Sequence, residues 1–271
     1  MRMFRNACLL LVAALSCASC ATTGSAATGG PAATTERVLF VGNSQLYVGN
    51  MPAVYAALAS ANDHPTRSDM IVRGGASLAE RVVDGSIAAA LQEHRYAAVV
   101  VQERGGSLLC AFGPESCARS RQAIKAIAAL GREHGVQVVL LGSYQGLPTA
   151  SLSLVEAERE AAADAGIVHV EVSETLRRVR DIAPDLDWLH ADGSHPGKDL
   201  TLLDAMLLHR ALHGALPAAA GLTVNAPVYT TQSGLEATLR PATAPAPRPG
   251  TRRQVSYPAA TLEALLQAIG G

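Results

Sequence analysis

Short apolar runs alternate along this chain with longer segments of helical spacing, and this alternation restricts the fold more than any other feature of the sequence. The apolar runs lie at residues 38–41, 69–72, 97–101, 136–141 and 167–170, and the helical segments at 51–61, 77–94, 116–134, 151–165, 173–180 and 199–214. A strand covered on both faces reads as a continuous apolar run, and strands that alternate with helices form βαβ units. The pattern therefore predicts an α/β fold, in which helices flank a central parallel sheet on both faces.

The size and charge of the chain narrow its class further. Its 271 residues are 49% hydrophobic, which suffices for the core of one substantial domain. The net charge of −1 offers no polybasic surface for nucleic acid. The regular pattern weakens after residue 215, so residues 216–271 are expected to form a C-terminal extension. That extension holds a Pro/Ala-rich stretch at 241–249 and a possible terminal helix at 258–271.

The first residues have the organisation of an export signal. Arg2 and Arg5 precede a short apolar stretch, which ends in small residues and Cys20. Residues 1–20 are therefore interpreted as a signal peptide of the lipoprotein type, with Cys20 as the lipidated residue, and residues 21–36 as a flexible linker. Cys17 is a competing lipidation site, and simple secretion after cleavage near Ala21 or Ala26 is the alternative. Both versions place the protein outside the cytoplasm, either anchored in a bacterial envelope or free in the periplasm or medium.

The five cysteines fall into two groups, one in the N-terminal signal segment and one in the rest of the chain. Cys8, Cys17 and Cys20 belong to the N-terminal segment, whereas Cys110 and Cys117 belong to the globular part. Export leads to an oxidising compartment, where the latter pair could close a small disulfide loop, the alternative being two free thiols. Without its first 19 residues the chain has a formal charge of −3, which favours an uncharged or weakly charged substrate.

Polar residues gather directly after the predicted strands, where open parallel sheets form their sites. Ser44 lies on a turn between the first strand and the next helix, where the backbone N–H groups of the helix N-terminus could stabilise an oxyanion. A serine hydroxyl needs a base to become nucleophilic, and His195 is the candidate, with Asp192 three residues before it to fix the imidazole tautomer. Alone, Ser44 is more simply a helix-capping serine, and the Asp192–His195 pair a turn motif. Together they favour an enzyme.

These residues resemble the blocks of a known family. The segment Phe40-Val41-Gly42-Asn43-Ser44 is similar to the first block of the SGNH (GDSL-like) hydrolases, and Asp192-Gly193-Ser194-His195-Pro196 to their last block. A bacterial branch that has Gly-Asn-Ser in the first block matches better still, with similarity at 74–78, 101–103 and 188–190. The resemblance covers residues 37–215. It implies a three-layer, flavodoxin-like fold, a Ser44–His195–Asp192 triad and ester cleavage without a cofactor.

The resemblance also implies an oxyanion hole. The family uses the backbone amide of the serine, that of a glycine in the second block and an asparagine side chain in the third. Ser44 fits the first role, and Gly74 or Gly75 the second, with Gly75 preferred. No Gly-x-Asn-Asp motif follows the third strand. Gln102 offers an amide one methylene longer, and the alternative is that it only ties down a loop. Glu103 beside it is expected to be a solvated charge, unless it holds Arg104 or orients the site.

The sequence thus predicts a serine esterase or acylhydrolase with a small-molecule or polysaccharide-linked ester substrate and no nucleic-acid partner. Two alternatives come from other classes. A catalytically silent envelope binding protein could use the same scaffold, since a fold does not determine a function. A metal-dependent hydrolase could use the string His190, Asp192 and His195, whose spacing suits a divalent cation. The triad explains Asp192 and His195 without a metal.

Overall fold

The computed structural model of the chain describes residues 34–249 and 251–270. The predicted signal peptide, the candidate lipidation site Cys20 and most of the predicted linker lie outside these residues. Within the described part, no helix is long and apolar enough to cross a membrane.

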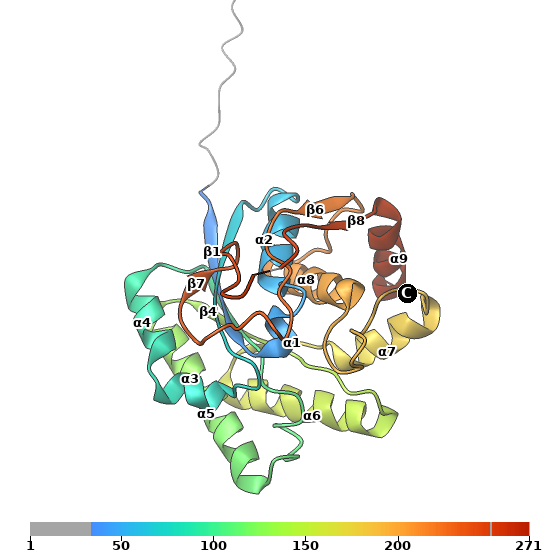
Figure 1. The fold of residues 1–271 in the computed structure, drawn as a ribbon. Helices are drawn as coiled ribbons and strands as arrows, with labels where there is room; N and C mark the ends of the chain where they lie inside the picture. Colours follow the sequence, from blue (N-terminus) through green and yellow to red (C-terminus); the bar gives the residue numbers. More distant parts are fainter. Residues whose placement is uncertain (1–33, 250, 271) are drawn as a thin grey trace, which may run out of the picture. The chain divides into compact units, whose positions relative to one another are not determined.

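A parallel sheet forms the centre of the fold and confirms the predicted α/β class (Figure 1). Its strands are β1 (Glu36–Gly42), β2 (Thr66–Val72), β3 (Ala98–Val101), β4 (Gln137–Leu141) and β5 (Val168–Val170). They are parallel and lie in the order β5-β4-β3-β1-β2, with β7 (Arg240–Pro241) antiparallel at the β2 edge. This is the flavodoxin-like order, in which the direction of strand addition reverses at β1.

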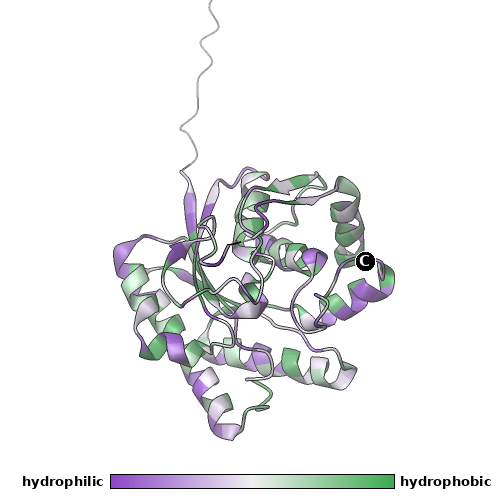
Figure 2. Cartoon of the chain, viewed as in Figure 1, coloured by the Kyte–Doolittle hydropathy of each residue, from purple (hydrophilic) through white to green (hydrophobic). Residues whose placement is uncertain are grey.

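Helices cover both faces of this sheet and create two cores. The helices α2 (Met51–Ser60), α7 (Ser173–Ile182), α8 (Lys198–His213) and α9 (Ala259–Gly270) contribute to one core. The helices α3 (Leu78–Val83), α4 (Ser86–Glu93), α5 (Pro114–His134) and α6 (Pro148–Ala165) contribute to the other. Successive side chains of β1 point to opposite faces, so Phe40 joins the first core and Leu39 the second. Both faces being buried explains the uninterrupted apolar runs, and Figure 2 shows the hydrophilic residues on the outer sides of the helices.

Two local details differ from the sequence-based prediction. The helix expected over residues 77–94 is two helices, α3 and α4, because Gly85 adopts φ +70° between them. A single turn of helix, α1 (Ser44–Tyr47), follows β1 and was not predicted. Two helices have side-chain caps: the side chain of Asn50 accepts from the N–H of Ala53, and Glu80 accepts from the N–H of Ser77.

The C-terminal extension packs against the rest of the fold. Besides β7, it contributes the antiparallel pair β6 (Leu222–Val224) and β8 (Val255–Tyr257) and the helix α9. Tyr229 and Tyr257 are fully buried, and the apolar side of α9 joins the core shared by α2 and α8. On the other side of the sheet, Cys110 and Cys117 form a disulfide with 4.7 Å between their Cα atoms.

Candidate active site

The residues predicted to carry the chemistry come from neighbouring strand ends. Ser44 follows β1, the pair Gly74 and Gly75 follows β2, and Gln102 follows β3. These strands are adjacent in the sheet and parallel, so their carboxyl ends share one edge. The order reverses at β1, and such a switch point is where open α/β sheets bind their ligands.

The turn that presents Ser44 is fixed by Asn43. Its side-chain oxygen accepts a hydrogen bond from the N–H of Gln45 at 3.1 Å, and its amide donates to the carbonyl of Gln102 at 3.4 Å. Asn43 is buried, so both bonds are shielded from water. Ser44 is half-buried, and within the described part of the chain its N–H donates to no other group. This N–H at the start of α1 is free to donate to a substrate oxygen.

Asp192 and His195 face each other across a tight turn. The Asp192 Oδ2 lies 2.8 Å from Nδ1 of His195, and Oδ1 accepts from the N–H groups of Ser194 at 2.9 Å and His195 at 3.0 Å. These backbone donors, and then the His195 side chain, hold the pKa of Asp192 well below its usual range. An ionised carboxylate at this distance keeps a proton on Nδ1. The lone pair of Nε2 is therefore available as a base.

Several contacts hold this turn in place. The Tyr144 hydroxyl donates to the carbonyl of Ser194 at 2.8 Å. Inside the turn, the N–H of His190 donates to the carbonyl of His195 at 2.8 Å. At its base, Trp188 is buried and its indole N–H donates to a backbone carbonyl just after α7 at 2.9 Å. Trp188 is thus a core anchor, and the turn is supported from β4, from α7 and from within.

Gly74 and Gly75 offer two further candidate donors. Within the described residues, neither N–H is engaged in a hydrogen bond, and both residues are exposed. Gly75 adopts φ +69°, which disfavours any side chain there, and a Cβ on Gly74 would lie 3.2 Å from the hydroxyl of Tyr47. Tyr47 itself is buried, and this burial raises the pKa of its phenol. The choice between the two glycines stays a prediction.

Gln102 has a structural contact that bears on its two interpretations. Its side chain is buried, and its amide donates to the carbonyl of Gly142 at 3.0 Å, which links the ends of β3 and β4. The contact favours the interpretation that Gln102 ties down a loop. Its role as an oxyanion donor stays a prediction, and would use the second N–H of the same amide.

Glu103 differs from the solvated charge that was expected. It is buried, and its Oε1 accepts from the N–H of Arg104 at 2.7 Å and from that of Leu78 at 3.4 Å. Burial raises the pKa of this carboxyl. Because Leu78 begins α3, Glu103 connects the end of β3 to the segment that follows Gly74 and Gly75.

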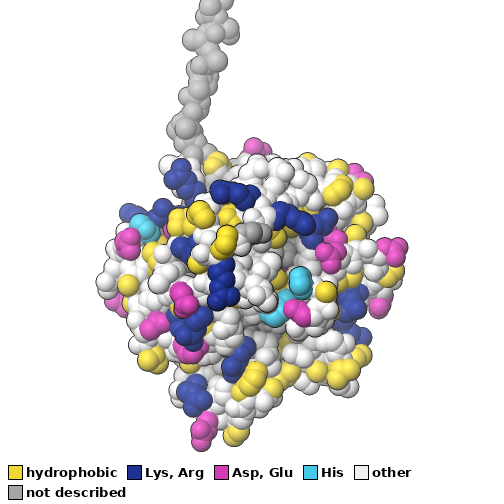
Figure 3. Space-filling model, viewed as in Figure 1, with side chains coloured by type: hydrophobic (Ala, Val, Ile, Leu, Met, Phe, Trp, Pro, Cys, Tyr) yellow, Lys and Arg dark blue, Asp and Glu magenta, His cyan; other side chains and the backbone are white. Residues whose placement is uncertain are grey.

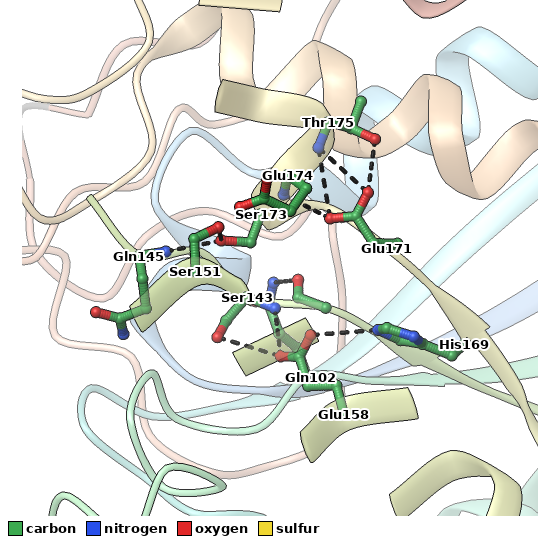
Figure 4. A network of polar contacts seen from close by, with 11 residues as sticks. Gln102, Ser143, Gln145, Ser151, Glu158, His169, Glu171, Ser173, Glu174 and Thr175 are labelled. Carbon is green, nitrogen blue, oxygen red and sulfur yellow. Dashed lines mark hydrogen bonds and ion pairs between the residues drawn. The ribbon is translucent and has the colours of Figure 1, made fainter. Parts of the chain in front are cut away.

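A buried polar network lies beneath the loop after β4 (Figure 4). Glu158 on α6 accepts from the N–H of Ser143 at 2.8 Å, and its other oxygen lies 3.2 Å from Nε2 of His169. Burial raises the pKa of Glu158, although His169 and Ser143 oppose the shift. Ser143 directly precedes Tyr144, so this network anchors the backbone next to the tyrosine that contacts the turn of Asp192 and His195.

His190 belongs to the same turn but makes a weaker contact. Its Nδ1 lies 3.6 Å from the carboxylate oxygen of Asp192 that also meets His195, and half of its side chain is exposed. Among the described residues, no three His, Cys, Asp or Glu side chains converge as a metal site requires. The imidazole nitrogens of His190 and His195 nearest Asp192 instead point at one carboxylate.

Cavities flank the turn on two sides. One, of about 230 Å³, is lined by Gln45, Tyr144 and Ser194, and a second, of about 690 Å³, is lined by Gly49 and His190 among others. Gln45 and Ser194, which adjoin Ser44 and His195 in the sequence, line the smaller cavity, but Ser44 and His195 themselves line neither of the two. Within the described part, no hydrogen bond joins the hydroxyl of Ser44 to His195. Such bonds are often long in unliganded enzymes. Figure 3 shows histidines next to an acidic side chain beside a hollow on the face drawn.

Two positioning residues escaped the sequence reasoning. Tyr144 follows β4 just as Ser44 follows β1, so reading the residues after the fourth strand as well as the first three would have found it. Glu158 lies in the middle of a helix, and its role depends on contacts with segments 15 and 11 residues away. No local sequence signal indicates it.

Comparisons with known proteins relate this architecture to solved structures. No protein-family model matches the sequence, and no curated protein matches it. A protein from Slackia heliotrinireducens described as a candidate SGNH hydrolase is 27% identical, with a TM-score of 0.52 over 65% of this chain and 97% of the other. TesA is 22% identical, with a TM-score of 0.51 over 65% and 99%. The acetylxylan esterase Axe2 from Geobacillus stearothermophilus, in a catalytic mutant, is 12% identical, with a TM-score of 0.52 over 65% and 94%. TesA and Axe2 are less than 25% identical to this chain, so they show a common fold alone. Together with the Slackia protein, these neighbours support a hydrolase.

Proposed function

We propose that this chain, whose fold is that of the SGNH/GDSL-like hydrolases, is a serine ester hydrolase with Ser44 as nucleophile, His195 as base and Asp192 as the group that orients His195. The observation that carries the proposal is the 2.8 Å contact between Asp192 and Nδ1 of His195, in a turn whose Ser194 lines the smaller cavity together with Gln45, the residue after Ser44.

The proposed reaction proceeds in two halves. Ser44 Oγ attacks the acyl carbonyl carbon, its proton passes to Nε2 of His195, and the carbonyl oxygen becomes an oxyanion. The N–H of Ser44 and that of Gly74 or Gly75 stabilise the oxyanion, with Gln102 as the third candidate donor. The ester C–O bond then breaks, and His195 returns the proton to the departing alcohol. In the second half, His195 takes a proton from water, whose oxygen attacks the carbonyl carbon of the acyl-enzyme. The bond between that carbon and Ser44 Oγ then breaks, His195 returns the proton to Oγ, and the acid is released.

Hydrolysis of a short p-nitrophenyl ester tests the proposal. Ser44→Ala and His195→Ala should each lower kcat by several powers of ten, on the order of 10³ or more. Ser153→Ala, an exposed serine on α6, is the matched control and should retain the wild-type rate. Equal rates in all four proteins would refute the proposal.

A fluorophosphonate probe followed by peptide mapping separates the alternatives. Labelling at Ser44 that disappears in His195→Ala supports the serine mechanism. A protein that is not labelled but binds a ligand in its cavities would be a silent binding protein. Activity that a chelator abolishes and zinc or manganese restores would instead favour the use of His190, Asp192 and His195 as metal ligands.

The place of action and the substrate class are part of the proposal. We propose export to the bacterial envelope, with Cys20 as lipid anchor, and the disulfide between Cys110 and Cys117 is consistent with an oxidising compartment. Mass spectrometry of the mature N-terminus tests this, because an unmodified start at Ala21 or Ala26 would contradict lipidation. An O-acyl group on a carbohydrate is the proposed substrate, and acetylated xylo-oligosaccharides are a suitable first assay, since the fold neighbour Axe2 is an acetylxylan esterase.

A further inference from the structure

The turn that carries Asp192 and His195 (residues 190–196) is called the catalytic turn below. The larger of the two cavities beside it is walled on one side by the C-terminal extension. Its first wall comprises Val48 and Gly49, directly after α1, together with Asp187, residues 190–191 and residues 196–198 at the start of α8. Its second wall comprises residues around Tyr229, between β6 and β7, and around Tyr257 on β8. The volume of about 690 Å³ is in the range of small-molecule sites. Ala191 and Pro196, which adjoin Asp192 and His195 in the sequence, line the cavity, whereas Ser44, Asp192 and His195 themselves do not. A different part of the chain forms the opposite wall.

Cations predominate among the charged residues of this cavity. Lys198, Arg248 and Arg252 line it, and within the described residues none of them forms an ion pair. Figure 3 shows Lys and Arg side chains on the same face as the histidines. The single acidic residue of the lining is Asp187, whose carboxylate accepts from the N–H of Lys198 at 3.3 Å. That bond occupies the first amide of α8, so the side chains rather than the helix end supply the positive charge.

The three cations have groups free to bind a ligand. The Lys198 ammonium lies 5.6 Å from the ring centre of Tyr257. Within the described residues, the guanidinium of Arg248 donates a single long hydrogen bond of 3.4 Å, to the carbonyl of Gln232. Arginine presents paired N–H donors that match a carboxylate or phosphate, whereas lysine acts as a mobile point charge. Three cations against one acid in a concave surface focus a positive potential there.

We propose that this cavity binds an anionic group, a carboxylate, on the ester substrate, with Lys198, Arg248 and Arg252 as its counter-ions. The proposal rests on the ester hydrolase activity proposed above and names the substrate class of that same site. It differs from the expectation from net charge, in which an uncharged or weakly charged ester is easier to accept. The formal charge of the whole domain is negative, but the potential that a substrate meets is local to the cavity.

Matched pairs of esters test this proposal and show which side of the ester carries the anion. Mono-p-nitrophenyl glutarate and p-nitrophenyl pentanoate differ by a carboxylate at the end of the acyl chain. Acetoxybenzoate and its methyl ester differ by a carboxylate on the leaving group. In at least one pair, the wild type should have a higher kcat/KM for the anionic member. In the double variant Arg248→Gln/Arg252→Gln that preference should fall about tenfold.

The control is Arg67→Gln, because Arg67 is also exposed but lies at the amino end of β2, opposite the site. It should keep the wild-type preference. The preference should also weaken as ionic strength rises, because salt screens exposed charges. A preference that is the same in the wild type and the double variant for both pairs would overturn the proposal while leaving ester hydrolysis intact.

A binding measurement separates this proposal from the proposed function. Calorimetric titration of Ser44→Ala with glutarate and with benzoate should show binding that the added Arg248→Gln/Arg252→Gln changes weaken about tenfold. If no ester is hydrolysed, the proposed function fails, and this titration alone decides whether the cavity binds a carboxylate. Absence of binding, or binding of equal strength with and without the two arginines, would refute the anion site.

Discussion

Replacing Asp192 by asparagine should remove catalysis while leaving the catalytic turn in place. The Asp192 Oδ1 accepts from two backbone N–H groups, and an asparagine oxygen can keep both of these bonds. The other position, 2.8 Å from Nδ1 of His195, then holds an NH₂ group instead of an oxygen. Two donors cannot face each other, so His195 must move its proton from Nδ1 to Nε2.

This change of tautomer determines the size of the effect. With its proton on Nε2, His195 can no longer accept the proton of Ser44, and the nucleophile is not activated. The same substitution in a well-studied serine-protease triad lowers kcat by about 10⁴, and we expect a loss of about 10³ to 10⁴ here. Asp192→Ala should lose as much activity. It should also unfold at a lower temperature than Asp192→Asn, because alanine removes the acceptor of both backbone bonds.

The assay compares kcat on a p-nitrophenyl ester and thermal unfolding for the wild type and both variants. NMR of the His195 ring nitrogens adds a direct readout, since the proton should lie on Nδ1 in the wild type and on Nε2 in Asp192→Asn. An Asp192→Asn enzyme that keeps more than a tenth of the wild-type kcat would refute this account of the turn. So would a loss of activity with an unchanged tautomer.

Three further predictions follow from contacts outside the triad. Tyr144→Phe removes one hydrogen bond to the catalytic turn, worth about 1 kcal/mol, and should lower kcat several-fold with little change in KM; an unchanged kcat would show that the bond does not position the turn. Burial, followed by repulsion from neighbouring histidines, lowers the pKa of His213 to about 4, and burial also lowers that of His209. The unfolded chain therefore binds more protons between pH 6.5 and 4. As the pH is lowered from 6.5 to 4, the free energy of unfolding measured in urea should therefore fall by about 1–2 kcal/mol, a value reduced because His213 is partly exposed. His213→Gln should flatten this pH profile. The variant Cys110→Ser/Cys117→Ser should lose about 2 kcal/mol in the same assay, as expected for a short closed loop, and equal stability would contradict this.

The parts of the fold that the sequence predicted are those in which local pattern and tertiary environment agree. The run Val38-Leu39-Phe40-Val41 is apolar because both faces of β1 are covered, so its environment is visible in its composition. Where a single residue decides where a helix ends, the apolar periodicity of the sequence was misleading. Gly85 has a left-handed conformation that ends α3, although the apolar spacing continues into α4. The two residues of β7 are in a strand only because they pair with β2, and no local signal shows this.

The same distinction applies to the candidate site. Asp192 and His195 are three residues apart, so their contact forms within one turn, and the sequence could predict it. The Gly142 carbonyl that Gln102 contacts lies 40 residues away, at the end of another strand. Of the two N–H groups that Glu103 accepts from, that of Leu78 lies 25 residues away, on α3. Sequence reasoning could name the chemistry of these two side chains but not their neighbours. That is why Gln102 kept two interpretations and Glu103 was expected in solvent.

The C-terminal extension links the fold to the question of specificity. The matched solved structures cover nearly all of their own chains but about two thirds of this one, a share close in length to residues 37–215. The sheet and the strand-end residues can thus be accounted for by a domain of that size. The wall of the large cavity that carries Arg248 and Arg252 comes from the extension instead. The proposed chemistry therefore rests on the common fold, whereas the proposed preference for an anionic ester rests on the segment added to it. Replacing Arg248 and Arg252 should alter which ester is preferred, whereas replacing Ser44 should abolish the reaction for every ester.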